Sequence, residues 1–311
     1  MTLPYKSART PGPLGVQPDA PGGGIPGPLR FDHVDLSKGA ATKAVAKALA
    51  MPAPASGGTV ILRARVVAWN LSKDAPRPED VTQGELFNCP VAAILAALAH
   101  TASGRRRIDS MVTEYTGAPV KTTFSDDVRA ALAARYDDPD YLPPPREIAS
   151  SRYFSVALDP AVEVSDVFYT RYSDGADADL IYMGSPASVL WPCVIEKAYA
   201  AKVGGYQYFN DFLKHTITEF WPVLAGTKLQ GFKVDAKTDV NKIGDAVKAA
   251  TQVPTVAASN DRAKAVTTLH GFAVLGMQGS TIELWDPRGK KEKISLSDFR
   301  DNFQDIFFSG L

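Results

Sequence analysis

Helical patterns come first along this chain and strand-like patterns come later, and this order restricts its fold. After an alternating stretch over 59–69, apolar residues recur at helical spacing between 90 and 136, whereas alternation returns from 153 onward. A helix over 192–203, with a proline start and a Gly-Gly end, interrupts the later strands, and a short one is expected near 296–303. Because strands and helices do not alternate as βαβ units, the pattern favours an α+β fold with two lobes.

The first 58 residues are expected to form a flexible leader outside the compact core. Residues 1–30 contain seven Pro and six Gly, a composition that buries too little apolar surface to offset chain entropy. A short helix over 36–50 and a second linker rich in Pro, Ala, Ser and Gly complete it. An inhibitory pro-segment, a tether and an export tag are all open interpretations. The core is expected over 59–311, with one lobe over about 59–150 and the other over about 151–311.

Composition and charge exclude several classes of protein. The 34 Lys and Arg residues balance the 34 Asp and Glu residues, so the basic excess typical of nucleic-acid and membrane-surface proteins is absent. The longest apolar run, 90–99, is about half the roughly 20 residues that a membrane-spanning helix needs. Two cysteines rule out a disulfide framework and a cysteine-rich zinc site, and they favour a reducing compartment or thiols kept for chemistry. Residues 1–16 lack the apolar segment of a signal peptide, so the protein is expected in the cytoplasm or is exported by a dedicated route.

Cys89 is the first candidate for chemistry, because it lies where a helix is expected to begin. Pro90 and an almost wholly apolar run to Ala99 follow it, and proline is preferred at the first helical position. The positive end of the helix dipole favours the thiolate form, which is the nucleophile in cysteine catalysis. A buried structural cysteine is the alternative interpretation. The second cysteine, Cys193, lies inside an expected helix between apolar residues and is assigned to the core.

Gln83 is a candidate to assist such a nucleophile, since it lies six residues upstream of Cys89. An acyl-transfer site needs hydrogen-bond donors aimed at the oxyanion that develops on the carbonyl. A side-chain amide together with a backbone N–H beside the nucleophile can supply them. Contact with solvent is the simpler interpretation of a Gln in a loop.

Four histidines are candidates for the general base, and three of them are unsuited to it. His100 lies eleven residues along the expected helix from Cys89, or roughly 16 Å at about 1.5 Å per residue. His33 belongs to the leader, and His215 has the ordinary neighbours of a surface or packing histidine. His270 remains, at the start of a strand expected over 269–277.

A hairpin is expected to bring His270 to a carboxylate. Its second strand, 281–285, leads into Asp286, and folding about Gln278 and Gly279 places Asp286 opposite His270 to within one residue. A carboxylate there fixes the imidazole tautomer and stabilises the imidazolium, as the third member of a nucleophile, base and orienter set does. An ordinary amphipathic hairpin is the alternative, but it gives no reason for His and Asp to meet at its open end.

Taken together, these segments resemble the protease core of the calpains, which belong to the papain-like cysteine proteases. The likeness rests on Gln83-Gly84 six residues before Cys89, on the helix after that cysteine, and on the order Gln, Cys, His, acidic residue. Its most specific part is the stretch 190–200, Leu-Trp-Pro-Cys-Val-Ile-Glu-Lys-Ala-Tyr-Ala, which is similar to a Trp-Pro and Glu-Lys-Ala-Tyr-Ala helix of calpain cores. The turn over 285–289, Trp-Asp-Pro-Arg-Gly, completes the likeness, which covers roughly 78–311.

The resemblance implies a papain-like two-lobed fold, with a helical lobe that carries Cys89 and a β-rich lobe that carries His270 and Asp286. It implies a cysteine endopeptidase that hydrolyses polypeptide substrates through a thioester acyl-enzyme and needs no cofactor. Cys89 would be the nucleophile, His270 the base and later the acid, Asp286 the orienter and Gln83 an oxyanion donor. Two departures stand out: Pro90 occupies a position where calpains usually have Trp, and 286–289 reads Asp-Pro-Arg-Gly where they usually have Asn-Pro-Trp-Gly.

Calcium, which typically switches calpain cores, has no recognisable ligand motif in this sequence. The acidic loops 137–140 and 174–179 lack the spaced ligands and terminal Glu of a calcium hand, and are expected to be solvated turns. Two alternatives to a peptidase stay open. One is a related deamidase, isopeptidase or other acyl-transfer enzyme. The other is a non-catalytic structural or interaction protein that keeps the calpain-like scaffold.

Overall fold

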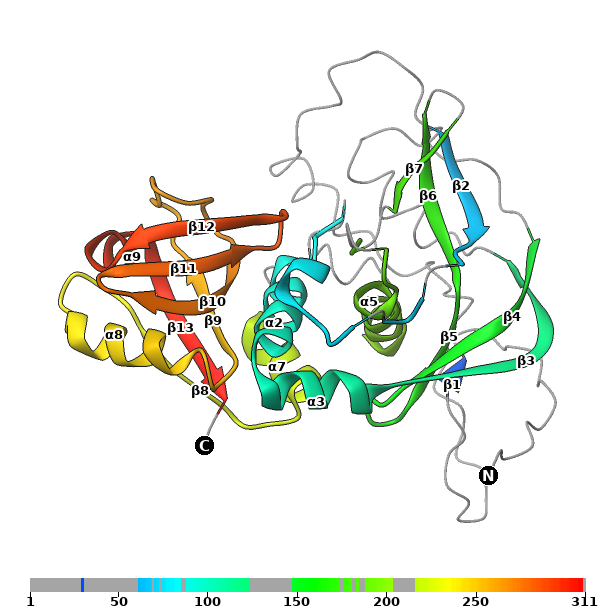
Figure 1. Cartoon of the computed structure of the whole chain (residues 1–311), viewed down its shortest axis with the longest axis horizontal. Helices are drawn as coiled ribbons and strands as arrows, with labels where there is room; N and C mark the ends of the chain where they lie inside the picture. Colours follow the sequence, from blue (N-terminus) through cyan, green and yellow to red (C-terminus); the bar gives the residue numbers. More distant parts are fainter. Residues whose placement is uncertain are drawn as a thin grey trace. The chain divides into compact units, whose positions relative to one another are not determined.

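The computed structural model describes residues 29–30, 61–68, 70–72, 74–84, 88–123, 147–173, 176–180, 183–184, 188–203 and 216–309 (Figure 1). Over these residues the chain is a mixed α+β protein, as the sequence predicts. It divides into two compact units: 1–68, 112–181 and 194–211 form the first, and 69–111, 182–193 and 212–311 form the second. This division differs from the boundary expected near residue 150, because the chain passes between the units several times.

The first unit contains two small sheets and most of one helix. Its elements are β1 (Leu29–Arg30), β2 (Ile61–Val66), β3 (Val112–Thr123), β4 (Glu147–Val156), β5 (Val162–Ser165), β6 (Val167–Ser173), β7 (Ala176–Leu180) and most of α5 (Trp191–Val203). One sheet has the order β1-β5-β4-β3, with β1 parallel to β5 and the other pairs antiparallel. The other is antiparallel, with the order β2-β6-β7. Strand β1 is the only part of the expected leader within the described residues, and the helix expected over 36–50 lies outside them.

Helix α5 confirms the helix expected over 192–203. Its residues from Trp191 to Ala201 are buried, including Lys197 in the middle of the helix. The Lys197 ammonium donates hydrogen bonds to the backbone carbonyls of Ser165 and Val167, each at 3.1 Å. These carbonyl acceptors allow a charged side chain to be buried, since an ammonium without partners would be strongly destabilising there.

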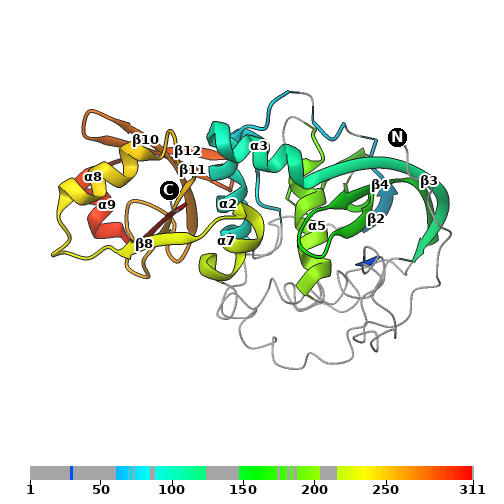
Figure 2. The same cartoon turned by 90° about the horizontal axis from the view of Figure 1, so that it is seen from below.

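The second unit is built on a six-stranded antiparallel sheet. Its elements are η1 (Pro78–Asp80), α2 (Cys89–His100), α3 (Ala102–Met111), α7 (Ile217–Ala225), β8 (Leu229–Lys233), α8 (Val240–Ala249), β9 (Thr255–Ser259), β10 (Gly271–Gln278), β11 (Thr281–Asp286), β12 (Lys290–Ser295), α9 (Leu296–Asn302) and β13 (Phe303–Ser309). The strand order is β12-β11-β10-β9-β13-β8. Helices α8 and α9 lie on one side of this sheet, away from α2, in both views (Figures 1 and 2).

A hydrophobic core fills the space between α8, α9 and the sheet. Helix α8 contributes Ile243 and Val247, and the sheet contributes apolar side chains from β9, β10, β11, β12 and β13. Three phenylalanines form its aromatic centre: Phe299 stacks on Phe303 with ring centroids 4.2 Å apart, and Phe272 meets Phe303 edge-on at 5.5 Å. This packing holds β10 and β11, the two strands of the expected hairpin, in fixed positions.

Several sequence predictions of the elements are wrong or incomplete. The helix expected around 108–115 ends at Met111, and β3 starts at the next residue. The strands β8, β9, β12 and β13 were not expected. Strand β12 is an edge strand with lysines at 290, 291 and 293, a composition that protects an exposed edge but hides the strand from a pattern search. The helix expected over 125–136 lies outside the described residues.

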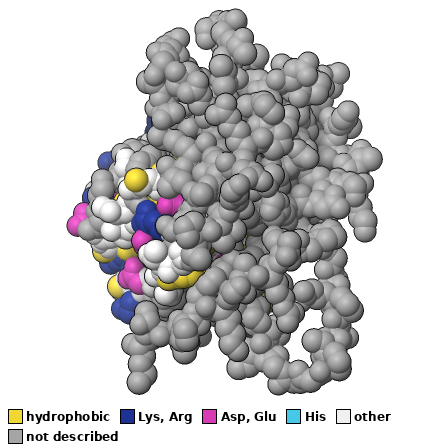
Figure 3. Space-filling model, turned by 90° about the vertical axis from the view of Figure 1, so that its right-hand side faces the viewer, with side chains coloured by type: hydrophobic (Ala, Val, Ile, Leu, Met, Phe, Trp, Pro, Cys, Tyr) yellow, Lys and Arg dark blue, Asp and Glu magenta, His cyan; other side chains and the backbone are white. Residues whose placement is uncertain are grey.

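The described part of the surface seen in Figure 3 carries acidic and basic side chains interspersed with apolar ones. This mixture agrees with the formal net charge of zero. Among the helices that the structure describes, none has the length and hydropathy to cross a membrane.

Candidate active site

Cys89 is the first residue of α2, where the sequence predicts it. Pro90 lies in the first turn and Asn88 is the N-cap residue. Every residue from Val91 to Ala99 is exposed by 2% or less, so the helix is enclosed by the core almost all round. Cys89 itself is half-buried. The core therefore fixes the helix, and the helix fixes the thiol at its partly open end.

His270 directly precedes β10 and is only 6% exposed. Its backbone is held on both sides by Ser259, the last residue of β9. The His270 N–H donates to Ser259 Oγ at 2.9 Å, and the Ser259 N–H donates to the His270 carbonyl at 2.9 Å. The Ser259 hydroxyl in turn donates to the Thr267 carbonyl at 2.6 Å. No sequence signal identifies this positioning role of Ser259, because the pairing of β9 with β10 is not visible in the sequence.

Asp286 contacts the imidazole as expected. His270 Nε2 and Asp286 Oδ1 lie 2.9 Å apart, and Asp286 is 4% exposed. The same oxygen accepts the backbone N–H of Arg288 at 2.8 Å, which holds the carboxylate in the turn. Because Nε2 is bound to the carboxylate, Nδ1 is the ring nitrogen left to face another group.

The register of the hairpin differs from the prediction. The turn lies at Gly279-Ser280, and Ala273 pairs with Trp285, so Asp286 falls opposite Phe272 and not opposite His270. A bulge between Val274 and Gly276 contributes to the shift. Residues two apart on a strand share a face, so His270 and Phe272 both lie on the side of Asp286, and the imidazole reaches it diagonally.

Helix α2 and strand β10 pack closely enough to bring the thiol to the imidazole. Gly271 makes this possible, since a Cβ on it would lie 3.3 Å from the Cβ of Ala93 and 3.3 Å from the carbonyl oxygen of Cys89. This packing brings the imidazole of His270, the neighbour of Gly271, near the thiol of Cys89, whose interaction with the ring is one cause of the raised pKa of His270. The structure therefore brings Cys89, His270 and Asp286 close together, and all three belong to the second unit.

These contacts change the protonation of the imidazole and the carboxylate. Burial by itself lowers the pKa of His270, but the hydrogen bonds with Asp286 and Cys89 outweigh it and raise the pKa from 6.5 to about 9. Burial by itself raises the pKa of Asp286, but the hydrogen bond with His270 and the attraction of its charge outweigh it, so the pKa lies below its ordinary value. Both effects favour an imidazolium beside a carboxylate.

The backbone of Gln83 contacts the turn that begins at Asp286. Its N–H donates to the carbonyl of Pro287, the residue after Asp286. Two residues earlier, the Val81 carbonyl accepts the indole N–H of Trp285 at 2.9 Å. The segment around Gln83 is thus attached to the strand end that carries Asp286, which places Gln83 near the candidate site.

The remaining candidates are consistent with structural roles. Cys193 is fully buried, and its thiol donates to the Leu190 carbonyl at 3.1 Å. His100 is the last residue of α2, and burial is the largest cause that lowers its pKa. His33 and His215 lie outside the described residues. Within the described ranges, no three His, Cys, Asp or Glu side chains are grouped as metal ligands would be.

In comparisons with known proteins, no family model and no curated protein matches the chain.

Proposed function

We propose that the protein is a cysteine endopeptidase of the papain-like, calpain-related type, with Cys89, His270 and Asp286 as its catalytic triad. The observation that carries this proposal is the position of His270, which is bonded to Asp286 through Nε2 and precedes Gly271, the residue that packs against the backbone of Cys89. A nucleophile, a base and an orienting carboxylate in one line is the arrangement that acyl transfer requires. The proposal includes a papain-like fold, but not the expected division of the triad between two lobes, because Cys89, His270 and Asp286 all belong to the second unit.

The first half of the reaction is acylation. The Cys89 thiol gives its proton to His270, and the sulfur attacks the carbonyl carbon of the scissile peptide bond. A C–S bond forms while the C–N bond breaks, and His270 gives the proton to the departing amine. Asp286 keeps the imidazole oriented and stabilises its charged form, which the raised pKa of His270 supports.

The second half regenerates the enzyme. His270 takes a proton from water, whose oxygen attacks the thioester, and the C–S bond breaks as the carboxylic acid leaves. In both halves a negative charge develops on the carbonyl oxygen. The side-chain amide of Gln83 and the backbone N–H of Cys89 are the proposed donors to that oxygen, since such donors lower the barrier most when they are fixed in advance. No cofactor takes part in either half.

A thiol-directed probe tests whether this site is formed and reactive. We expect a peptidyl acyl-transfer probe to label Cys89 selectively and to leave the buried Cys193 unmodified. His270→Ala should abolish fast labelling, whereas His100→Ala, a matched change at the other end of α2, should not. Equal and slow labelling of both cysteines would overturn the proposal that Cys89 is a catalytic nucleophile, and would favour a non-catalytic scaffold.

Cleavage of a peptide library tests the reaction class. Wild-type protein should generate new amino and carboxyl termini within peptides, detected by mass spectrometry, and Cys89→Ala should generate none. A Cys89-dependent mass change at glutamine side chains, or at isopeptide bonds, without main-chain cleavage would assign the site to the related deamidase or isopeptidase class.

A further inference from the structure

Leu269, the residue before His270, has two features that folding alone disfavours. Its side chain is 53% exposed, and no other large hydrophobic side chain is exposed within the described residues. Its φ is +48°, in the left-handed region that residues with a Cβ rarely adopt. An apolar side chain in a strained conformation and in contact with water contributes little to stability, so the feature calls for another explanation.

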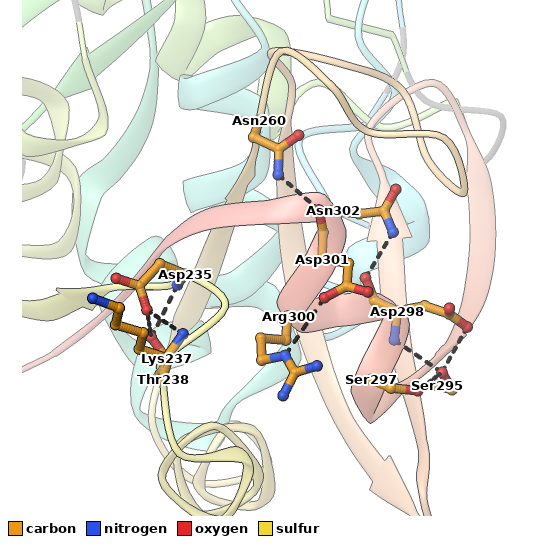
Figure 4. A network of polar contacts seen from close by, with 10 residues as sticks. All are labelled: Asp235, Lys237, Thr238, Asn260, Ser295, Ser297, Asp298, Arg300, Asp301 and Asn302. Atoms are coloured by element: carbon orange, nitrogen blue, oxygen red, sulfur yellow. Dashed lines mark hydrogen bonds and ion pairs between the residues drawn. The ribbon is translucent and has the colours of Figure 1, made fainter.

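The loop that carries Leu269 is fixed by polar contacts to α9 and its end. The Leu269 N–H donates to the Asn260 carbonyl at 3.2 Å, and the Asn260 amide donates to the Asp301 carbonyl at 3.0 Å (Figure 4). Two backbone N–H groups of the loop donate to Oδ1 of Asn302, whose own amide donates to the carbonyl of Asp298. The hydrogen bonds around this loop can hold Leu269 in an unfavourable backbone conformation. Such backbone strain is found most often at functional sites.

Leu269 lies directly beside the reacting groups. It is covalently joined to His270, whose buried ring contacts Cys89 and Asp286, and Ser259 holds the two ends of this segment through Thr267 and the backbone of His270. Leu269 is thus an exposed apolar residue one position away from a member of the candidate site. A substrate bound over Cys89 would remove this apolar surface from water, which is favourable in proportion to the area covered.

We propose that Leu269 forms the apolar wall of a substrate subsite, so that the enzyme prefers polypeptides with an aliphatic or aromatic side chain next to the scissile bond. This inference rests on the proposed peptidase function and adds a specificity-determining residue to it. A substrate with a polar residue at that position would leave Leu269 in contact with water, or would bury its own polar group without a partner.

Leu269→Asn is the informative substitution. Asn is similar in size to Leu, is polar, and tolerates the left-handed conformation better, so the folded state should keep its melting temperature or gain in it. Leu229→Asn is the matched control, because Leu229 is a half-buried leucine on β8, at the edge of the sheet and three strands away from β10.

The measurement uses two peptidyl probes with the same reactive group, one with Leu and one with Asn beside the reacting carbonyl. Wild-type protein should label Cys89 faster with the Leu probe, by about tenfold, since a modest apolar contact is worth one to two orders of magnitude in rate. The ratio of the two rates should fall toward one in Leu269→Asn and stay at the wild-type value in Leu229→Asn.

The outcomes separate this inference from the proposed function. Equal labelling by the two probes in wild-type protein, or an undiminished ratio in Leu269→Asn, would overturn the subsite while leaving the peptidase intact. Labelling that shows the preference without any cleavage of the matching peptides would support the subsite and refute the peptidase, because labelling requires only a reactive Cys89 and a bound probe.

Discussion

Replacing Asp286 by Asn tests the central contact of the candidate site without changing its shape. Asn keeps an oxygen that can accept from His270 Nε2 and from the Arg288 N–H, but it removes the negative charge. The His270 pKa is about 9 because Asp286 and Cys89 together outweigh the effect of burial. An opposite charge at this range shifts a pKa by about 1–3 units, so Asp286→Asn should lower the His270 pKa by on the order of one to two units.

The same pKa predicts how stability depends on pH. As the pH rises through 6.5, an unfolded His270 releases its proton, whereas the folded one keeps it until about pH 9. The stabilisation is therefore fully present below pH 6.5 and is lost between pH 6.5 and about pH 9. A rise from 6.5 to about 9 corresponds to about 3 kcal/mol of unfolding free energy, at about 1.4 kcal/mol per pKa unit.

Two measurements check this reasoning. NMR of the imidazole C–H groups gives the His270 pKa directly in both proteins, with His270→Gln to assign the signal. Urea unfolding at pH 6 to 10 gives the decline of stability, which should be smaller in Asp286→Asn because its folded His270 releases the proton earlier. A wild-type His270 pKa near 6.5, or the same decline in both proteins, would refute the ion-pair interpretation.

Other expected outcomes concern the supports of the site and its independence of metal. Gly271→Ala should slow alkylation of Cys89, because the added Cβ would press on the start of α2 at 3.3 Å; an unchanged rate would show that α2 can shift at no cost. Ser259→Ala should lower the unfolding free energy by about 1–3 kcal/mol, measured in urea, since the buried N–H of His270 loses its acceptor. Ile243→Ala, in the core beside α8, should destabilise by about 2–5 kcal/mol but leave the labelling rate of Cys89 unchanged well below the melting temperature. Chelation by EDTA should leave that labelling rate unaffected; a loss restored by calcium would contradict the proposal that the enzyme needs no cofactor.

The elements that the sequence predicts well are those whose signals are local. Pro90 and the apolar run after it locate α2 to within a residue, and the Trp-Pro start and Gly-Gly end locate α5. The approximate meeting of His270 and Asp286 also follows from a local hairpin, because few residues separate its strands. Elimination among four histidines then points to His270, the one that contacts Asp286.

What the sequence does not reveal depends on contacts between distant segments. The register of the hairpin is shifted by a bulge at Gly276, which has a φ of +131°. A glycine inside a strand is compatible with a bulge, but it does not by itself fix the register. Strand β13 pairs with both β9 and β8, pairings that bring together residues 44 to 80 positions apart. The support that Ser259 gives to His270, and the strain at Leu269, are consequences of that sheet and become visible only with it.

Cys89 is the first residue of α2, a helix enclosed by the core of the second unit. The reactivity of its thiol therefore depends on the folded state of that unit. Because α2 is buried from Val91 to Ala99, the sulfur of Cys89 cannot be displaced by a local rearrangement that leaves the interior intact. Thiol reactivity therefore becomes a reporter of cooperative unfolding. On heating, its change should coincide with the loss of the near-ultraviolet signal of the buried aromatic rings, and should not precede it.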